Sequence, residues 1–478
     1  MTQVELVEDG PGAGPAPGGP RHGDAALRRV VRLLAPPAAA LLAVSLLADA
    51  AAECTRAAAF AEVRGVLQPG QSVRPVWELG PRAELVLDGV VLDGTLVGAL
   101  AGETTLTGFV GLDPDSGARR WEMAAAVPDD LRATELWAGC DGVDGLAVCF
   151  AYAWSGEAGG GEEWQAAWVL DPADGRPVRS WRPPDDAGMR IAGRSLVEYS
   201  GLDGEGRRTQ VWSYPDRVRL TALDPATGAE RWVWTSVAID DLGEGPWDAW
   251  PLGDQTLVTR GARGWLVDDA DGAARELPGV ASVGSFAATR TGQVFQVRYA
   301  AVDHGSLLRE DGTWAEVPGT VLALAVDDGS APGLAYFRGR ADDRADDRGT
   351  LASDATGAVR RWAPAEGELA LLLDGVLVVA DGTSVTALDA LTGQVAWSVD
   401  LDTAATDLGA DGTAVLVARD PATVSAFDLH DGRPLWERDA LAAVEGPGVR
   451  WDDEQVRLGT AVARPVLVRA DGSAVVLR

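Results

Sequence analysis

From about residue 74 to the C-terminus, the chain alternates short apolar runs with polar turns. In LALLLDGVLVVADGTSVTAL, residues 369–388, each apolar run has the length of one β-strand, and Asp-Gly pairs separate the runs. Nothing in this stretch has apolar residues at the spacing of a helix. The pattern therefore predicts an all-β domain over residues 74–478.

A different pattern occupies the N-terminal part of the chain, where residues 33–53 form one mainly apolar run. About 20 such residues can cross a bilayer as a helix. Three arginines precede the run and little positive charge follows it, so the positive-inside rule places the large domain outside the cytoplasm. We therefore expect a single-pass cell-membrane protein with an extracytoplasmic β domain.

The segments on either side of this run complete the predicted domain organisation. Residues 1–32 are rich in Pro and Gly and are expected to be a disordered cytoplasmic tail. Residues 54–73 are expected to be a short stalk. A cleaved signal peptide is the alternative to the transmembrane anchor, because Ala48-Asp49-Ala50 has the small-x-small pattern of a cleavage site.

One motif recurs along the β region with fixed spacing: an Asp, a Gly four residues later, and a Trp four residues after the Gly. Four copies keep all three residues: Asp113, Gly117 and Trp121; Asp224, Gly228 and Trp232; Asp389, Gly393 and Trp397; Asp428, Gly432 and Trp436. Four degenerate copies lie near Asp171, Asp268, Gly312 and Asp354. Successive copies are mostly about 40 to 45 residues apart, which is the length of one propeller blade.

Each residue of the motif has a structural role. The Asp side chain can cap backbone amides of a turn. The Gly supplies the positive φ that a bulged hairpin turn needs. The large Trp ring must be covered, and since one sheet cannot cover it alone, the ring is expected to pack on the next sheet. Repetition then closes the sheets into a ring.

The copies at Ala222 and Ala387 match A-x-D-x-x-T-G-x-x-x-W at every specified position. This motif resembles the docking motif of PQQ-like repeats in quinoprotein-dehydrogenase-like β-propellers. The resemblance covers residues 74–478 and implies about eight four-stranded blades, with seven or nine left open. It also implies a membrane-anchored protein of actinobacterial origin. VRADGSAVVLR, at the C-terminus, is expected to complete a closing blade with the strand near Trp77.

Composition excludes several functions. The formal charge of −31 and the pI of about 4.4 argue against nucleic-acid binding, because such a surface repels phosphate backbones. The sequence contains no Lys and no Asn. A P-loop lysine, a Schiff-base lysine and an N-glycosylation site are therefore all absent.

Two of the three cysteines, Cys140 and Cys149, flank a predicted hairpin turn in AGCDGVDGLAVCF. The hairpin would place the two thiols on facing strands, so a disulfide is one interpretation if the domain is exported. Two small buried thiols are the other interpretation. No Cys or His pair accompanies them, so the sequence does not predict a metal site here.

The resemblance leaves two functional hypotheses. Related enzymes hold the quinone cofactor PQQ with Ca²⁺, using carboxylates and often an Asn, and many have adjacent cysteines. This chain has neither an Asn nor a Cys-Cys pair. We therefore predict a non-catalytic interaction module that binds a protein or a cell-envelope partner, with no catalytic, cofactor or metal residues assigned. The alternative is a membrane-anchored PQQ-dependent oxidoreductase that uses PQQ and Ca²⁺.

Overall fold

A computed structural model gives the structure of the chain. It describes residues 60, 63, 65–67, 73–101, 106–125, 135–154, 163–184, 186–209, 215–238, 247–252, 254–260, 263–278, 280, 284–288, 294–298, 304–309, 313–340, 348–354, 359–363, 367–420, 422–445, 455–459 and 461–478. Residues 59–478 form one compact unit. The predicted tail and the predicted transmembrane anchor, residues 1–32 and 33–53, lie outside the described residues.

Nearly all the regular structure is β-strand. The helices in the described part of the chain are α2 (Glu84–Leu87) and α3 (Ala440–Glu445), and neither is long enough to cross a membrane. Every sheet is antiparallel apart from one added parallel strand. The prediction of an all-β domain is confirmed.

The chain builds the first four blades from consecutive strands. Blade 1 comprises β2 (Val90–Leu92), β3 (Thr95–Ala101), β4 (Leu106–Leu112) and β5 (Arg119–Ala124). Blade 2 comprises β6 (Glu135–Val143), β7 (Leu146–Trp154), β8 (Glu163–Leu170) and β9 (Pro177–Trp181). Blade 3 comprises β10 (Ala187–Ala192), β11 (Ser195–Leu202), β12 (Arg208–Thr209), β13 (Arg217–Leu223) and β14 (Glu230–Thr235). Blade 4 comprises β15 (Asp248–Leu252), β16 (Gln255–Arg260), β17 (Arg263–Asp268) and β18 (Ala274–Pro278).

Four more blades follow in chain order. Blade 5 comprises β19 (Gly284–Ala288), β20 (Val294–Arg298), β21 (His304–Leu308) and β22 (Trp314–Pro318). Blade 6 comprises β23 (Thr320–Val321), β25 (Leu334–Arg340), β26 (Arg348–Asp354) and β27 (Val359–Ala363). Blade 7 comprises β28 (Leu369–Leu373), β29 (Val376–Asp381), β30 (Ser384–Asp389) and β31 (Val395–Asp400), and β24 (Leu324–Asp327) joins it in parallel with β28. Blade 8 comprises β32 (Ala405–Ala410), β33 (Ala414–Arg419), β34 (Thr423–Asp428) and β35 (Pro434–Asp439).

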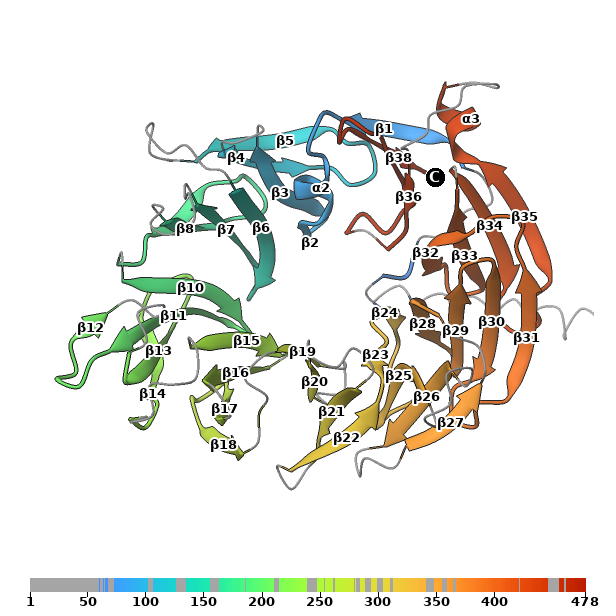
Figure 1. Ribbon diagram of the computed structural model, residues 1–478. Helices are drawn as coiled ribbons and strands as arrows, with labels where there is room; N and C mark the ends of the chain where they lie inside the picture. The colour runs from blue at the N-terminus through green and yellow to red at the C-terminus, as the bar shows by residue number, and fades with distance from the viewer. Residues whose placement is uncertain are drawn as a thin grey trace, which may run out of the picture. The chain divides into compact units, whose positions relative to one another are not determined.

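A closing blade combines both ends of the described chain. It comprises β36 (Gln455–Arg457), β37 (Val466–Val468), β38 (Ala474–Leu477) and β1 (Pro75–Leu79). β1 pairs antiparallel with β38, and Trp77 lies opposite Val476. The sheets follow one another around a central axis (Figure 1). The described residues thus form eight successive blades and a shared closing blade, which together make the predicted β-propeller.

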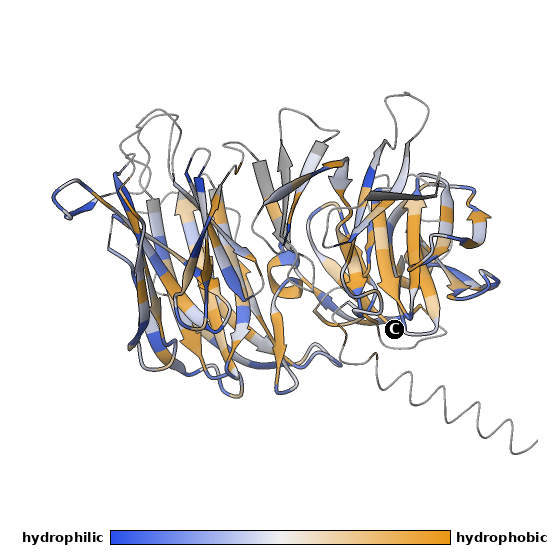
Figure 2. Ribbon diagram, turned by 90° about the horizontal axis from the view of Figure 1, so that it is seen from below, coloured by the Kyte–Doolittle hydropathy of each residue, from blue (hydrophilic) through white to orange (hydrophobic). Residues whose placement is uncertain are grey.

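The hydrophobic core lies between neighbouring blades. All six residues of β33 are buried, and β29 is buried from Val376 to Ala380. Such middle strands are covered on both faces, so they have continuous apolar sequences rather than alternating ones. Figure 2 shows these apolar residues concentrated along the strands.

Part of the predicted stalk packs on the propeller. Val66 forms a β-bridge with Ala410 of β32, and the Leu67 amide donates to the Ala410 carbonyl at 2.7 Å. Phe60 is buried in the same apolar cluster as Val66. These described residues of segment 54–73 therefore belong to the compact unit.

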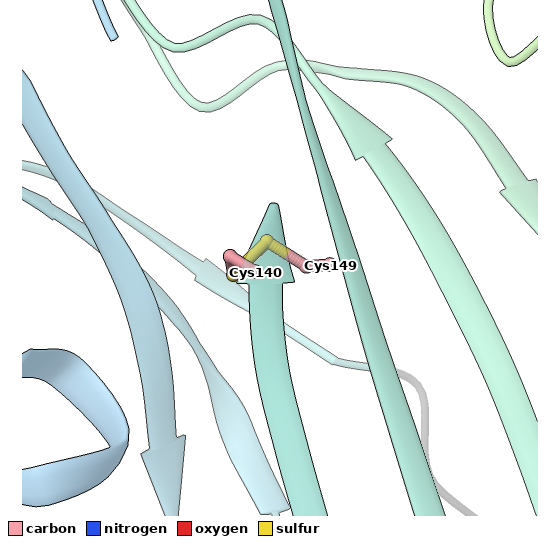
Figure 3. Close-up of a disulfide and its surroundings, with 2 residues drawn as sticks. All are labelled: Cys140 and Cys149. Carbon is pink, nitrogen blue, oxygen red and sulfur yellow. A yellow bond between two sulfur atoms is a disulfide. The ribbon is translucent and has the colours of Figure 1, made fainter. Parts of the chain in front are cut away.

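Cys140 and Cys149 are joined by a disulfide across the β6–β7 hairpin (Figure 3). They lie directly opposite each other in the strand register, and their Cα atoms are 4.0 Å apart. That short distance is typical of the non-hydrogen-bonded pairs of an antiparallel ladder. Both side chains are buried in the core between blades 1 and 2, in the same cluster as Phe109 and Trp168.

Candidate functional site

In each of the four complete motif copies, the turn is held by the side chain of its Asp. In blade 3, the Asp224 Oδ1 accepts hydrogen bonds from the backbone amide and the hydroxyl of Thr227, both at 2.8 Å. The Gly228 amide donates to the Asp224 carbonyl at 2.7 Å, and Gly228 has a φ of 68°. Asp113 and Asp389 cap their turns in the same way, and Asp428 accepts from the backbone amide of Asp431. We call this element the docking turn.

The docking turns of blades 1, 2, 4 and 8 each receive the indole ring of a Trp from the preceding blade. The indole N–H of Trp121 donates to the Pro172 carbonyl in blade 2 at 2.8 Å. The same bond joins Trp232 to Asp269, Trp397 to Leu429 and Trp77 to Pro114, and each acceptor directly follows the Asp of its turn. The ring lies over the turn glycine: a Cβ on Gly175 would come within 2.3 Å of the Trp121 ring.

The three residues of one motif copy therefore belong to two different contacts. Asp113 and Gly117 receive Trp77 of the closing blade, whereas Trp121 docks on blade 2. Gly432 receives Trp397 of blade 7. Trp436 is half-buried against a core cluster shared with the closing blade. These residues hold neighbouring blades together rather than forming a catalytic group.

An arginine directly before the Trp strengthens two of the docking turns. Arg120 donates to the Asp113 carboxylate at 2.7 Å, and Arg231 donates to the Asp224 carboxylate at 2.7 Å. These bonds favour the ionised acid and lower the pKa of both Asp113 and Asp224 to about 2. The two turns consequently keep their capping carboxylates ionised across the whole range near neutral pH.

The docking turn of blade 4 contains a carboxylate whose pKa is raised instead of lowered. Asp269 is buried, and only its Oδ1 has a hydrogen-bond partner among the described residues, the Thr256 hydroxyl at 2.8 Å. Desolvation raises the pKa of Asp269 to about 6. In the folded protein this group remains protonated well above the pH at which it ionises in the unfolded chain.

Replacement of Asp269 by Asn should remove a pH-dependent loss of stability. As pH rises from about 4 to 6, the unfolded state ionises first while folded Asp269 keeps its proton, so the wild type loses stability over this window. Thermal unfolding of D269N and wild type at pH values from 4 to 7 measures the difference. Asp141→Asn, at an exposed carboxylate, is the control. Parallel pH profiles for D269N and wild type would contradict the assignment.

The junction between blades 2 and 3 departs from the regular docking scheme. Arg179, eight residues after Asp171, takes the place of the Trp and lies over Gly228, where it donates to the Thr227 carbonyl. Trp181 comes two residues too late, and its buried indole N–H has no acceptor among the described residues. This junction therefore lacks the indole hydrogen bond found at the regular junctions.

A tyrosine side chain also contacts the docking turn of blade 7. The Tyr336 hydroxyl of blade 6 donates to the Ala390 carbonyl at 3.1 Å, and Ala390 directly follows Asp389. Tyr336 lies on β25, a middle strand, so sequence spacing from a docking turn does not reveal it. Burial raises the pKa of its phenol well above the ordinary value.

Aromatic side chains are exposed on the blade 2 face next to this irregular junction. Trp137 of β6 is 65% exposed and Phe150 of β7 is 37% exposed. Trp137 lies opposite Tyr152 in the register, and Phe150 lies opposite Gly139, so the three rings share one face of the sheet. We call these three residues the aromatic face.

The aromatic face points toward blade 3 but is only partly covered by it. Val148, two residues before Phe150 on the same face, is fully buried in a cluster with Leu196 and Leu223 of blade 3. Inner strands of a blade normally have their faces covered by the next blade. Exposure of Trp137 and Phe150 therefore shows that blade 3 covers one end of this face and leaves the other open.

The position of β10 explains the open end. The Met189 amide on β10, the innermost strand of blade 3, donates to the Gln165 side chain on β8, the third strand of blade 2. At the row of Trp137, Tyr152 and Gln165, β10 therefore lies over β8 and leaves β6 uncovered. In Figure 1, β6 and β10 approach each other at their C-terminal ends and diverge toward their N-terminal ends, where Trp137 lies.

Polar groups on blade 3 face the same junction. Glu198 of β11 is only 6% exposed and forms an ion pair with Arg208 at 2.7 Å. Ser200, two residues further along the same face, is also buried. The junction thus combines exposed aromatic rings on blade 2 with a neutralised charge pair on blade 3. The sequence did not predict it.

The chemistry of quinoprotein enzymes has no visible counterpart in the described residues. No cluster of three or more His, Cys, Asp or Glu side chains suited to a metal ion occurs in that part of the chain. Asp113, which begins the calcium-loop-like stretch DPDSG, is instead bonded to Ser116 and Arg120. The exposed aromatic face is the feature of the described residues that suits binding.

One family model matches part of the chain, and solved structures with similarity to the chain are known. Residues 343–476 match the family model described as outer membrane protein assembly factor BamB. No curated protein matches the chain. One similar solved structure is BamB from Moraxella catarrhalis, with 14% identity, a TM-score of 0.40, and coverage of 85% of this chain and 100% of that one. Another is the computationally designed protein Ika8, with 13% identity, a TM-score of 0.37, and coverage of 87% and 99%.

Proposed function

We propose that this chain, a PQQ-like β-propeller, is a non-catalytic module that binds another protein on the extracytoplasmic side of a membrane. The observation that carries the proposal is Trp137, a 65% exposed indole on an innermost strand. Exposed aromatic residues of this kind are enriched at protein interfaces, where they contribute much of the binding energy.

Two further observations support a binding role. The Asp, Gly and Trp residues of the repeats are engaged in blade docking, which leaves them no role in chemistry. Residues 343–476 match a family whose described member is an assembly factor. A scaffold that binds partners is consistent with both.

The extracytoplasmic location rests on the chain's own residues. The apolar run 33–53 follows a cluster of arginines and is long enough to serve as a membrane anchor. The disulfide between Cys140 and Cys149 suits an oxidising compartment. Labelling of cells with a membrane-impermeant reagent that attaches to the propeller would support this location, and labelling only after lysis would contradict it.

Photo-crosslinking tests the binding surface. A photo-reactive amino acid at position 137 is expected to capture a partner protein in cells. The same amino acid at position 391, which replaces the 59% exposed Leu391 in the docking turn of blade 7, should not capture it. Mass spectrometry of the crosslinked peptides identifies the captured segment.

The outcome distinguishes specific binding at this surface from non-specific adsorption. Capture of the same protein at both positions, or no capture at position 137, would contradict the proposal. Trp137→Ala in the full-length chain should reduce recovery of the partner about 10-fold or more, because truncation of a central aromatic anchor commonly costs 2 kcal/mol or more of binding free energy. Leu391→Ala, the matched control, should not change it.

A further inference from the structure

β6 is the longest innermost strand among the described residues. It has nine residues, whereas β10 and β32 have six each and β15 and β19 have five each. β6 pairs with β7 on one side, and no described strand pairs with its other side. Its inner edge therefore presents a row of backbone donors and acceptors on which another strand can form.

Three positions of β6 define what an added strand would meet. Trp137, Gly139 and Asp141 alternate along the strand and share one face. Trp137 and Asp141 are exposed. Gly139 has no side chain, and the Phe150 ring lies beside it, 3.2 Å from the position that a Cβ would occupy. An incoming strand thus meets an indole, a phenyl ring and a carboxylate in succession.

The face of β6 formed by Trp137, Gly139 and Asp141 carries a negative charge, that of Asp141. No ion pair joins Asp141 to a described cation. The arginines at the nearby β6–β7 turn are used by another carboxylate, because Arg194 and Arg231 pair with Asp144 at 2.6 and 3.3 Å. The whole chain carries a formal charge of −31. An acidic segment would be repelled, and a basic one would be attracted over a long range.

We propose that an extended, basic segment of another protein adds to the inner edge of β6 as a strand. This inference rests on the proposed function and specifies the partner's chemistry. Three alternate residues of the segment lie on the side of the aromatic face. A large apolar residue lies opposite Trp137, an aliphatic residue lies against the Phe150 ring at Gly139, and an Arg or Lys lies opposite Asp141.

Strand addition fits this position better than adsorption on the rings alone. Main-chain hydrogen bonds to β6 hold the segment, and the alternate side chains provide selectivity. Because the face changes with every residue, a shift of one position would turn all three recognised side chains away from the aromatic face. The proposal therefore predicts a strict two-residue spacing in the partner.

Synthetic peptides test the inference on the full-length chain in detergent. The probe is a fluorescent peptide with Leu, Val and Arg at alternate positions separated by Thr, prepared in both sequence directions. Fluorescence anisotropy should show that one direction binds about 10-fold or more tightly than its twin with Glu in place of Arg. Trp137→Ala should weaken binding about 10-fold or more, and Leu391→Ala should leave it unchanged.

Two controls isolate the charge and the backbone. Asp141→Asn should reduce the preference for Arg over Glu to about 3-fold or less, because the attracting carboxylate is gone. N-methylation of the probe on the backbone amides that face β6 should abolish binding, since it removes donors without changing side chains. Equal affinity for the Arg and Glu peptides, or full binding of the methylated peptide, would overturn the proposal.

The remaining outcomes are also decisive. A self-association that Trp137→Ala abolishes, measured by sedimentation, would assign the edge of β6 to a second copy of the chain and overturn the proposal. Capture of a partner at position 137 through a segment without the basic, alternating pattern would overturn this inference while the proposed function stands. Failure of capture, with peptide binding intact, would instead leave the recognition chemistry standing and contradict the cellular role.

Discussion

Replacement of Trp397 by Ala is expected to lower the free energy of unfolding by about 3–5 kcal/mol. The indole of Trp397 is buried between blades 7 and 8, lies over Gly432, and donates to the Leu429 carbonyl at 2.9 Å. Truncation leaves a cavity that the rigid docking turn cannot fill. It also leaves the buried carbonyl without its donor, which adds to the loss.

The matched control is the same substitution at an exposed indole. Trp137→Ala removes an identical side chain from the aromatic face, and we expect a change of about 0.5 kcal/mol or less in stability. Denaturant unfolding followed by circular dichroism compares the two variants with wild type. Equal losses for Trp397→Ala and Trp137→Ala would show that the docking indoles do not hold the blades together.

The second large loss in the free energy of unfolding is expected on substitution of the glycine beneath a docked ring. Gly117 has a φ of 68°, and a Cβ there would lie 2.5 Å from the Trp77 ring. Gly117→Ala thus incurs the left-handed backbone penalty of about 1–2 kcal/mol. The added methyl group also displaces the Trp77 ring from its position over the turn, and this overpacking lowers stability by about 1–3 kcal/mol.

Gly375→Ala separates these two contributions. Gly375 has a similar φ of 73°, but no atom lies within 4 Å of the position of its Cβ. Only the backbone penalty applies, so this variant should lose about 1–2 kcal/mol. If denaturant unfolding shows the same loss of unfolding free energy for Gly117→Ala as for Gly375→Ala, then the close approach of the Trp77 ring does not contribute to the destabilisation.

Local chemistry made much of the fold predictable. The capping Asp and the positive-φ Gly act within one turn, so their spacing in the sequence specifies the hairpin directly. The Trp adds the requirement for a neighbouring sheet, and the repeat then predicts a ring. The closing blade was also predictable, because the C-terminal strand and the strand near Trp77 are both incomplete alone.

Other features depend on contacts between distant segments. β24 follows β23 in the chain but pairs with β28 of the next blade, and no local pattern distinguishes the two strands. Tyr336 contacts the docking turn of blade 7 from a middle strand, outside the motif. Arg179 did leave a signal, since it stands eight residues after Asp171, where a Trp occurs in the complete copies.

The aromatic face was not predictable from the sequence. Trp137 and Phe150 occur in an apolar stretch that looks like any buried strand. Their exposure arises because β10 lies over β8 rather than β6 at the row of Trp137 and approaches β6 only toward its C-terminal end, and this offset is a property of how two blades pack. The sequence predicts that a large aromatic side chain will be buried by the next blade, but it does not show at which positions that burial is incomplete.

The shared closing blade has a consequence for biosynthesis. β1 is made before the eight intervening blades, but its partner β38 is made after all of them. Until β38 has been synthesised, β1 has an open edge, and Trp77, the ring for the first docking turn, lies on a strand that lacks its partner. Completion of the circle therefore depends on synthesis of β38, and a product terminated before β38 would remain an open chain of blades.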